Sequence, residues 1–298
     1  MKGVALVQAS TRPRLMPSEA VLALHDYQKS YFDFAEFKPE IPSLLHQGSL
    51  VADSLAVIQR LGMIEPLTGA YVPPGSIDLS CTNYREGFIA NGLLSRNRAV
   101  LKVLERTYGS VETLAQQQIY LVEAIGGFAS WMRRHIGEQG LVCSEFLDGS
   151  EILVSDIPHQ DLCKLSFASQ AFDLVLCHEL FEHVRDIDQA FSEIHRVLNA
   201  EGRLIATCPL AIGQKDSIVK ARLNQETGKP DVIGEPEHHG DPVRPSQGSL
   251  VYRIPGWEIL GQLKRAGFKN TTIHHVCSWR HGILGSDIPG VLVIEAQR

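Results

Sequence analysis

The hydrophobic pattern of the chain is clearest within one stretch of fewer than 40 residues. Residues 172–177 form a short apolar run, which is typical of a strand buried on both faces. A capping-box spacing begins at Asp186, and apolar residues recur at helical intervals over 187–198. A second apolar run covers 203–208. Strand, helix and strand at this spacing predict a parallel crossover unit.

A second region has the pattern expected at the start of a nucleotide-binding α/β fold. The run from residue 119 predicts a buried strand, followed by a glycine turn and a helix over 128–136. The turn reads EAIGG, so a GxGxxG motif is absent from it. The other predicted elements are helices at 98–108 and 256–267, strands at 141–145, 269–277 and 290–296, and a further strand or hairpin at 151–154.

The first 80 residues carry a weaker pattern that predicts two helices, 17–37 and 50–61. We interpret residues 1–80 as a helical N-terminal extension of a main domain, 81–298. The extension would cover that domain or contribute to a dimer or acceptor surface, and a separate functional module is the alternative.

Composition narrows the class of protein. A hydrophobic content of 44% and a charged content of 21% are ordinary for a soluble globular protein. The net charge of −6 argues against a nucleic-acid partner. There is no run of 18 apolar residues, so we expect no membrane span, and the N-terminus lacks the apolar core of a signal peptide. Six scattered cysteines without a CxxC pair predict reduced thiols, a cytoplasmic location and no structural zinc.

Polar residues follow the predicted strands at the ends where open parallel sheets bind ligands. The strand at 172–177 is followed by His178, Glu179, Glu182 and His183. Glu145 ends the strand that begins at residue 141, and an acid in this position can accept two hydrogen bonds from ribose hydroxyls. The sequence therefore predicts a ligand site at this edge of the sheet.

Two polar segments have more than one interpretation. Residues 81–98 contain Arg85, Arg96 and Arg98, and form either a solvated loop or a lid that contacts an anion. Residues 234–247 are a long polar insertion, and loops of this length in a compact domain are usually functional or disordered.

The stretch FDLVLCHELFEHVRDIDQAFSEIHRVLNAEGRLIATCP resembles the strand, EHV helix and RVL signature of the class I S-adenosylmethionine-dependent methyltransferases. The similarity covers residues 81–298. The resemblance implies a Rossmann-like α/β fold with a seven-stranded, mostly parallel sheet and helices on both faces. Three further motifs resemble those of a bacterial subgroup associated with glycan and O-antigen biosynthesis. The first motif contains Cys81, Gly92, Leu93, Ser95, Arg96 and Arg98, the second contains Ser144, Glu145 and Leu147, and the third is HHGDP.

The resemblance also implies which residues hold S-adenosylmethionine. Glu123 matches the acid that orients the amino-acid part of the cofactor, and Gly126 and Gly127 match the turn beneath it. Glu145 matches the acid that binds the ribose. The turn EAIGG departs from the glycine-richer turn of the family. This departure bears on the affinity for the cofactor more than on the fold.

Three further positions complete the implied cofactor site. Asp161 matches the acid that contacts the adenine amino group, and Leu162 lies alongside the ring. His178 matches the position after the fourth strand, near the sulfonium.

Methyl transfer to a hydroxyl needs a general base, and imidazole suits this role near neutral pH. The candidates are His178, His183, His239 and Asp241, of which we favour His239 or His178. His183 is interpreted as a structural partner inside a helix. His238, His239 and Asp241 have the side chains of a metal site, but adjacent histidines point apart, so we predict no metal.

The preferred hypothesis is an S-adenosylmethionine-dependent methyltransferase that methylates a hydroxyl of a sugar or glycan-linked acceptor. A methyltransferase for a small-molecule metabolite and a degenerate methyltransferase fold that serves as a binding module are alternatives. A nicotinamide-dependent oxidoreductase is disfavoured because GxGxxG is absent. The sequence is also compatible with a homodimer.

Overall fold

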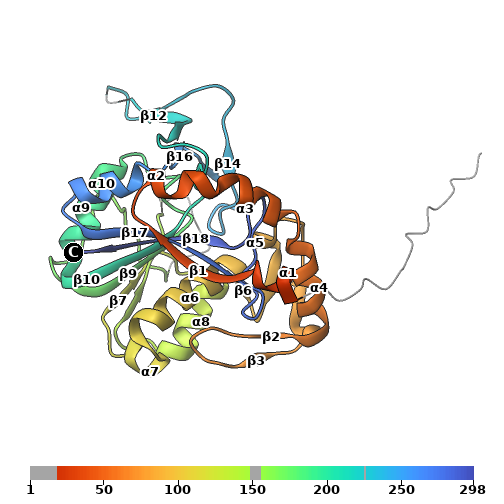
Figure 1. Cartoon of the computed structure of the whole chain (residues 1–298). Helices are drawn as coiled ribbons and strands as arrows, with labels where there is room; N and C mark the ends of the chain where they lie inside the picture. Colours follow the sequence, from red (N-terminus) through yellow and green to blue (C-terminus); the bar gives the residue numbers. More distant parts are fainter. Residues whose placement is uncertain (1–18, 148–155, 225) are drawn as a thin grey trace, which may run out of the picture.

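The computed structural model describes residues 19–147, 156–224 and 226–298. Its centre is a seven-stranded sheet in the order β1-β17-β18-β10-β9-β7-β8, which confirms the predicted strand number (Figure 1). The strands are β1 (Asp26–Tyr31), β7 (Ile119–Leu121), β8 (Leu141–Cys143), β9 (Phe172–His178), β10 (Leu198–Thr207), β17 (Lys269–Ser278) and β18 (Val291–Gln297). The strand or hairpin predicted at 151–154 lies outside the described residues.

One half of this sheet is the predicted parallel crossover. β8, β7, β9 and β10 are parallel neighbours. The helix α9 (Ile187–Val197) connects β9 to β10 and buries its apolar stripe against the sheet. Asp186 caps this helix, because its carboxylate accepts a hydrogen bond from the backbone N–H of Gln189 at 3.0 Å. The carboxyl ends of β7, β8 and β9 therefore meet at one edge of the sheet.

The other half of the sheet is antiparallel. β18 runs antiparallel to both β10 and β17, and β17 runs antiparallel to β1. The edge strand β1 comes from the N-terminal region, where the sequence predicted a helix over 17–37. That prediction is wrong, because the segment divides into α1 (Glu19–Ala23), β1 and α2 (Phe34–Phe37).

The tyrosines of β1 explain why a strand forms there. Tyr31 packs edge-on against Phe37 and Trp257, with ring centroids 5.1 and 6.2 Å away. Tyr27 packs edge-on against His275 of β17 at 5.1 Å. These contacts reach residues far along the chain, and the backbone of β1 pairs with the open edge of β17. Tertiary packing has overridden the local helical pattern.

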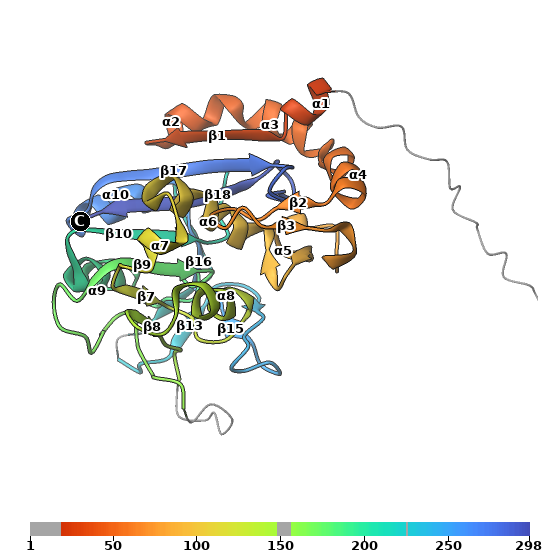
Figure 2. The same ribbon diagram turned by 90° about the horizontal axis from the view of Figure 1, so that it is seen from below.

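Helices cover both faces of the sheet (Figures 1 and 2). α6 (Ser95–Tyr108) and α8 (Gly127–Ile136) share one buried cluster with Leu174 and Leu176 of β9. α9 and α10 (Ile259–Arg265) share another with Val175 and Cys177. Alternate residues of β9 thus face opposite layers, as expected for a central strand.

The remaining elements surround this core. Near the N-terminus lie η1 (Lys38–Glu40), α3 (Ile41–Gly48), α4 (Val51–Leu61), β2 (Met63–Ile64), β3 (Tyr71–Val72) and η2 (Pro74–Ser76). They are followed by β4 (Ile77–Leu79), α5 (Tyr84–Gly87), β5 (Phe88–Ala90), β6 (Leu93–Leu94) and α7 (Val111–Leu114). The insertion after β10 forms β11 (Ile218–Val219), β12 (Ala221–Leu223), β13 (Pro230–Val232), β14 (His238–His239), β15 (Ser249–Leu250) and β16 (Arg253–Ile254).

The N-terminal region is only partly helical. α4 confirms the helix predicted at 50–61, but β1 belongs to the central sheet and β2 and β3 form a hairpin. A purely helical extension is therefore not confirmed, and the domain boundary at residue 80 stays a prediction. Within the described ranges, no single helix is both long and apolar enough to cross a membrane. Two consecutive helical segments, Phe34–Gly48 and Val51–Leu61, reach the required length and apolar composition only when taken together, and they are bent by 54° relative to each other.

Candidate functional site

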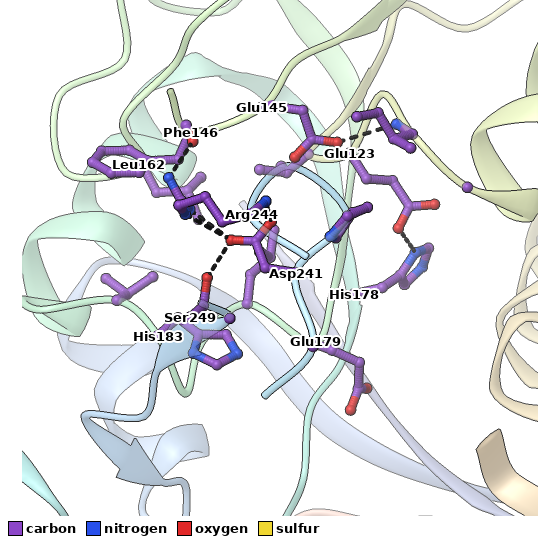
Figure 3. Close-up of a pocket in the computed structure, with 18 of the residues that line it drawn as sticks. Glu123, Glu145, Phe146, Leu162, His178, Glu179, His183, Asp241, Arg244 and Ser249 are labelled. Atoms are coloured by element: carbon purple, nitrogen blue, oxygen red, sulfur yellow. Dashed lines mark hydrogen bonds and ion pairs between the residues drawn. The ribbon is translucent and has the colours of Figure 1, made fainter. Parts of the chain in front are cut away.

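A cavity of about 640 Å³ opens at the carboxyl ends of β7, β8 and β9 (Figure 3). Its volume lies within the range of about 300–1,000 Å³ that is usual for small-molecule sites. It is lined by every residue predicted to hold the cofactor, namely Glu123, Gly126, Gly127, Glu145, Asp161, Leu162 and His178, and by Asp241. The structure therefore brings these separate segments to a single space.

Glu145 is held against the turn that follows β7. Its Oε1 accepts hydrogen bonds from the backbone N–H groups of Ala124 and Ile125, at 2.8 and 3.1 Å. Burial raises the pKa of Glu145, and the carboxylates of Glu123 and Asp241 add to that rise. Within the described chain, no hydrogen bond reaches Oε2, so this oxygen can accept hydrogen bonds from a ligand.

The EAIGG turn leaves space at one glycine and none at the other. Gly126 has φ +122°, and a Cβ there would meet nothing within 4 Å. A Cβ on Gly127 would lie 1.7 Å from the carbonyl oxygen of Gly92, in the β5–β6 turn. Gly127 is thus required for close packing, and Gly126 provides open space at the N-terminus of α8.

His178 is the most distinctive polar group in the cavity wall. Its side chain is fully buried, and neither ring nitrogen has a hydrogen-bond partner. Nδ1 lies 3.7 Å from Glu123 Oε2, and the ring packs edge-on against Phe128 with centroids 4.6 Å apart. Buried polar atoms normally have partners, so His178 is placed for a ligand.

Asp161 and Leu162 line the cavity from a short turn, and Leu162 lies well away from His178 (Figure 3). Asp161 Oδ1 accepts a hydrogen bond from the Cys163 backbone N–H at 2.9 Å, and Oδ2 pairs with Arg185. Leu162 is buried beside it. The pair with Arg185 was not predicted from the sequence, because the two residues are separated by the whole of β9.

The polar insertion places a second ion pair across the cavity. Asp241 Oδ2 accepts hydrogen bonds from Arg244 Nη2 at 2.7 Å and Ser249 Oγ at 2.6 Å (Figure 3). Arg244 also reaches the Phe146 carbonyl oxygen at 3.4 Å. Burial tends to raise the pKa of Asp241, but Ser249, the Val243 N–H and Arg244 lower it overall. Asp241 thus holds together a turn of the insertion itself, and Arg244 connects this turn to Phe146.

The arginines of residues 81–98 have different roles. Arg85 forms a bidentate pair with Glu179, with nitrogen–oxygen distances of 2.9 and 2.5 Å. Arg96 lines the cavity and donates to Glu86 at 2.9 Å. Arg98 is fully buried and donates to the carbonyl oxygens of Leu93, Phe88 and Gly282. Arg98 is therefore structural, whereas Arg85 and Arg96 belong to the site.

Glu182, His183 and His239 form a second polar group beside the cavity. The sequence placed His183 in a helix, but residues 181–183 form a turn between β9 and α9, so that prediction is wrong. His239 was predicted to reach over the site, and it lies instead against Glu182 and His183, while His238 lines the cavity. Burial raises the pKa of Glu182, and the Glu182 carboxylate raises the pKa of His239.

Residues 108–206 match a protein family described as a methyltransferase domain. No curated protein matches the chain. Among solved structures, an S-adenosylmethionine-dependent methyltransferase from Mesorhizobium loti is 17% identical with a TM-score of 0.40, over 64% of this chain and 99% of that one.

Two further structures have named substrates. The 1,6-didemethyltoxoflavin-N1-methyltransferase of Burkholderia thailandensis is 13% identical with a TM-score of 0.38, over 68% of this chain and 77% of that one. Phosphoethanolamine N-methyltransferase 2 of Haemonchus contortus, in complex with S-adenosylmethionine, is 18% identical with a TM-score of 0.37, over 62% of this chain and 40% of that one. Scores this low say nothing about the acceptor of this chain.

The polar groups that line the cavity fit S-adenosylmethionine. Glu123, Glu145, Gly126 and His178 all line this cavity, with open space at Gly126 and two buried, unpartnered ring nitrogens on His178. The matching domain covers β7, β8, β9 and α9, which position these groups. Together these findings support an S-adenosylmethionine-dependent methyltransferase with S-adenosylmethionine as its cofactor.

Proposed function

We propose that the chain transfers a methyl group to a hydroxyl of a sugar or glycan-linked acceptor. The observation that carries the proposal is the convergence of Glu123, Glu145 and Asp161, with the buried His178, on one cavity. The acceptor class is supported by the sequence similarity to the glycan-associated subgroup and by the polar insertion that lines the cavity. A cytoplasmic location and a homodimer remain predictions.

Each cofactor-binding residue has a distinct task in this proposal. Glu123 binds the amino-acid part of S-adenosylmethionine, and the turn at Gly126 and Gly127 approaches it from below. Glu145 accepts hydrogen bonds from the ribose hydroxyls through Oε2. When bound, the cofactor supplies an electrophilic methyl group on a sulfonium sulfur.

The adenine end is assigned to the turn at Asp161. Leu162 offers an apolar surface beside the ring, and the Asp161 carboxylate accepts a hydrogen bond from the adenine amino group. Arg185 pairs with Asp161 Oδ2 and fixes the orientation of that carboxylate. This arrangement separates the adenine end from His178, where the methyl group would lie.

The reaction requires that the acceptor hydroxyl lose its proton as its oxygen bonds to the methyl carbon. S-adenosylmethionine held by Glu123, Glu145 and Asp161 would supply this methyl carbon and would keep the electron pair of the sulfur–methyl bond on its sulfur. His178 is the better-placed base, because it lines the cavity and its ring nitrogens are unpartnered. His239 lies against Glu182, and the hydrogen bonds to Asp241 favour an anchoring role for that carboxylate.

The first experiment is calorimetric titration with S-adenosylhomocysteine. We expect binding to the wild-type protein and about 10–100-fold weaker binding to Glu145→Gln, because a hydrogen bond to a charged group is worth about 1.5–3 kcal/mol. Glu138→Gln, at an exposed position outside the cavity, is the matched control. Absence of any heat or thermal shift with the wild type would favour the alternative of a degenerate fold that acts as a binding module.

The second experiment identifies the acceptor. A panel of nucleotide sugars, oligosaccharides and small hydroxylated metabolites is screened for methyl transfer. We expect transfer to an oxygen of a sugar, and a loss of rate in His178→Asn that is much larger than its loss of cofactor affinity. Transfer only to metabolites without a sugar would contradict the proposed acceptor class, but methyl transfer would remain the reaction type.

A further inference from the structure

Glu182, His183 and His239 carry ligand atoms that all lie within 4.8 Å of one another. Glu182 and His183 belong to the turn after β9, and His239 belongs to β14 in the polar insertion. His183 also lines the cavity, so the group borders the proposed acceptor space. Two segments far apart in the sequence are thereby joined at one point.

The carboxylate of Glu182 is buried without a hydrogen-bond partner. The residue is 0% exposed, and neither Oε1 nor Oε2 accepts a hydrogen bond. The nearest nitrogens are His239 Nδ1 at 3.6 Å and His183 Nε2 at 3.7 Å from Oε1, which is beyond hydrogen-bond range. A buried carboxylate in this state is unfavourable unless a cation compensates it.

The outer nitrogen of each histidine is held by an oxygen. His183 Nδ1 lies 2.9 Å from the Leu250 carbonyl oxygen, and a carbonyl only accepts, so this nitrogen carries the proton. His239 Nε2 lies 3.3 Å from Glu237 Oε1 and donates to it. In the neutral rings, the inner nitrogens then present lone pairs toward Glu182. Metal-binding histidines are oriented in this way by a carbonyl or carboxylate on the other ring nitrogen.

The distances suit a shared ion. Metal–ligand bonds of about 2.0–2.2 Å place neighbouring ligand atoms roughly 3.0–3.5 Å apart, so a small contraction of the observed 3.6 and 3.7 Å, with the two histidine nitrogens within 4.8 Å of each other, lets the three groups share one ion. Two imidazoles and one carboxylate favour a first-row transition metal over magnesium or calcium. Since Glu182 is buried and His183 borders the cavity, the cavity gives further ligands a route to the ion.

We propose that Glu182, His183 and His239 bind one divalent transition-metal ion, whose open coordination positions face the cavity and take an oxygen of the acceptor. The acceptor part rests on the proposed function, because a bound cation would lower the pKa of a coordinated hydroxyl. The sequence predicted no metal because the adjacent His238 and His239 point apart, and it gave the Glu182 and His183 pair little weight as a further source of ligands. In the structure Asp241 pairs with Arg244, and the carboxylate comes from Glu182.

The test is titration of the full-length, chelator-treated protein with Co²⁺, followed by visible absorption. We expect one equivalent to saturate the bands and Zn²⁺ to abolish them. Glu182→Gln, His183→Ala and His239→Ala should each weaken Co²⁺ binding at least about 10-fold. His238→Ala, the neighbouring histidine on the same strand but outside the group, should leave the affinity unchanged. Circular dichroism verifies that each variant is folded.

Several outcomes would overturn the assignment. Wild-type protein without saturable Co²⁺ binding would remove the site, and three ligand variants with wild-type affinity would mean that the ion binds elsewhere. Where a variant does not fold, anomalous diffraction from wild-type crystals grown with Co²⁺ locates the ion, and an ion bound elsewhere contradicts the proposal. A vicinal diol sugar is expected to shift the bands, and an unchanged spectrum would remove the acceptor part.

The metal assignment and the proposed function can each be contradicted without contradicting the other. Binding of S-adenosylhomocysteine that depends on Glu145, in a protein that binds no Co²⁺, removes only the metal site. Co²⁺ binding that depends on Glu182, in a protein that binds no S-adenosylhomocysteine, removes only the methyltransferase.

Discussion

Glu179 and Glu182 lie three residues apart in the segment between β9 and α9, yet their surroundings are opposite. Glu179 forms two hydrogen bonds with Arg85 and has Arg96 nearby, while Glu182 accepts none. Burial raises the pKa of both carboxyls, but Arg85 and Arg96 more than reverse this for Glu179, whose pKa falls to about 2. One carboxylate is neutralised by the protein, and the other lacks a counter-ion.

This comparison separates two uses of a buried acid. The Arg85–Glu179 pair is complete in itself, so it joins α5 to the end of β9 and stabilises the cavity wall. Glu179 even adopts φ +52°, a backbone conformation that is unfavourable for a residue with a side chain. Glu182 instead faces two histidine nitrogens, which is an arrangement that needs a ligand.

The largest effect is expected when Glu179 loses its partner. Arg85→Met should lower the free energy of unfolding by about 2–4 kcal/mol, since it leaves a largely buried carboxylate unpaired. Urea unfolding at neutral pH measures the change, with Arg134→Met at an exposed position as control. A loss no greater than that of the control would mean that the ion pair contributes nothing to stability.

Acid should weaken the same pair. The folded pKa of Glu179 is about 2, below the value of about 4.3 in an unfolded chain, so its stabilisation is present above that value and is lost as pH falls towards 2. The shift corresponds to about 3 kcal/mol. Urea unfolding between about pH 6 and pH 3 should show that wild type loses more stability than Glu179→Gln. Parallel pH profiles would contradict the assignment.

Metal binding should stabilise the wild type through Glu182. At a free Co²⁺ concentration 100 times the wild-type dissociation constant, the free energy of unfolding should rise by about 2.7 kcal/mol. Thermal or urea unfolding with and without the ion measures this, and Glu182→Gln at the same concentration should gain no more than about 1.4 kcal/mol. An equal gain in both proteins would place the ion at another site.

The smallest effect is expected for Glu182 in the metal-free protein. Glu182→Gln should change the free energy of unfolding by less than about 1 kcal/mol or increase it, because removing an unpaired buried charge relieves a desolvation cost. Glu179→Gln under the same conditions should be clearly destabilising. Should Glu182→Gln cost as much as Glu179→Gln, the contrast between the two acids would not hold.

Much of the fold was readable from local pattern. Periodic apolar stripes gave α4, α6, α8 and α9 close to their observed bounds, and the capping position at Asp186 was right. The cofactor-binding acids follow strand ends, so topology alone brings them to one edge. The parts that depend on local spacing were therefore predictable.

Contacts between distant segments were not predictable in this way. β1 forms because its tyrosines and backbone find partners on β17, which the local sequence does not reveal. Arg85 meets Glu179 through the placement of α5 beside β9, and His239 meets Glu182 through a loop of irregular path. The pairing of Asp241 with Arg244 was within reach, because the two residues are three apart.

The N-terminal strand has a consequence for how the chain folds during synthesis. β1 is made first, but its partner β17 lies near the other end of the chain, with Tyr27 opposite Cys277. Contacts between such remote segments form slowly, because a long loop must close before they contribute. The edge of β17 therefore stays open until β1 docks, which makes this docking the natural last step of assembly and the stage at which partly folded chains are most prone to pair with one another.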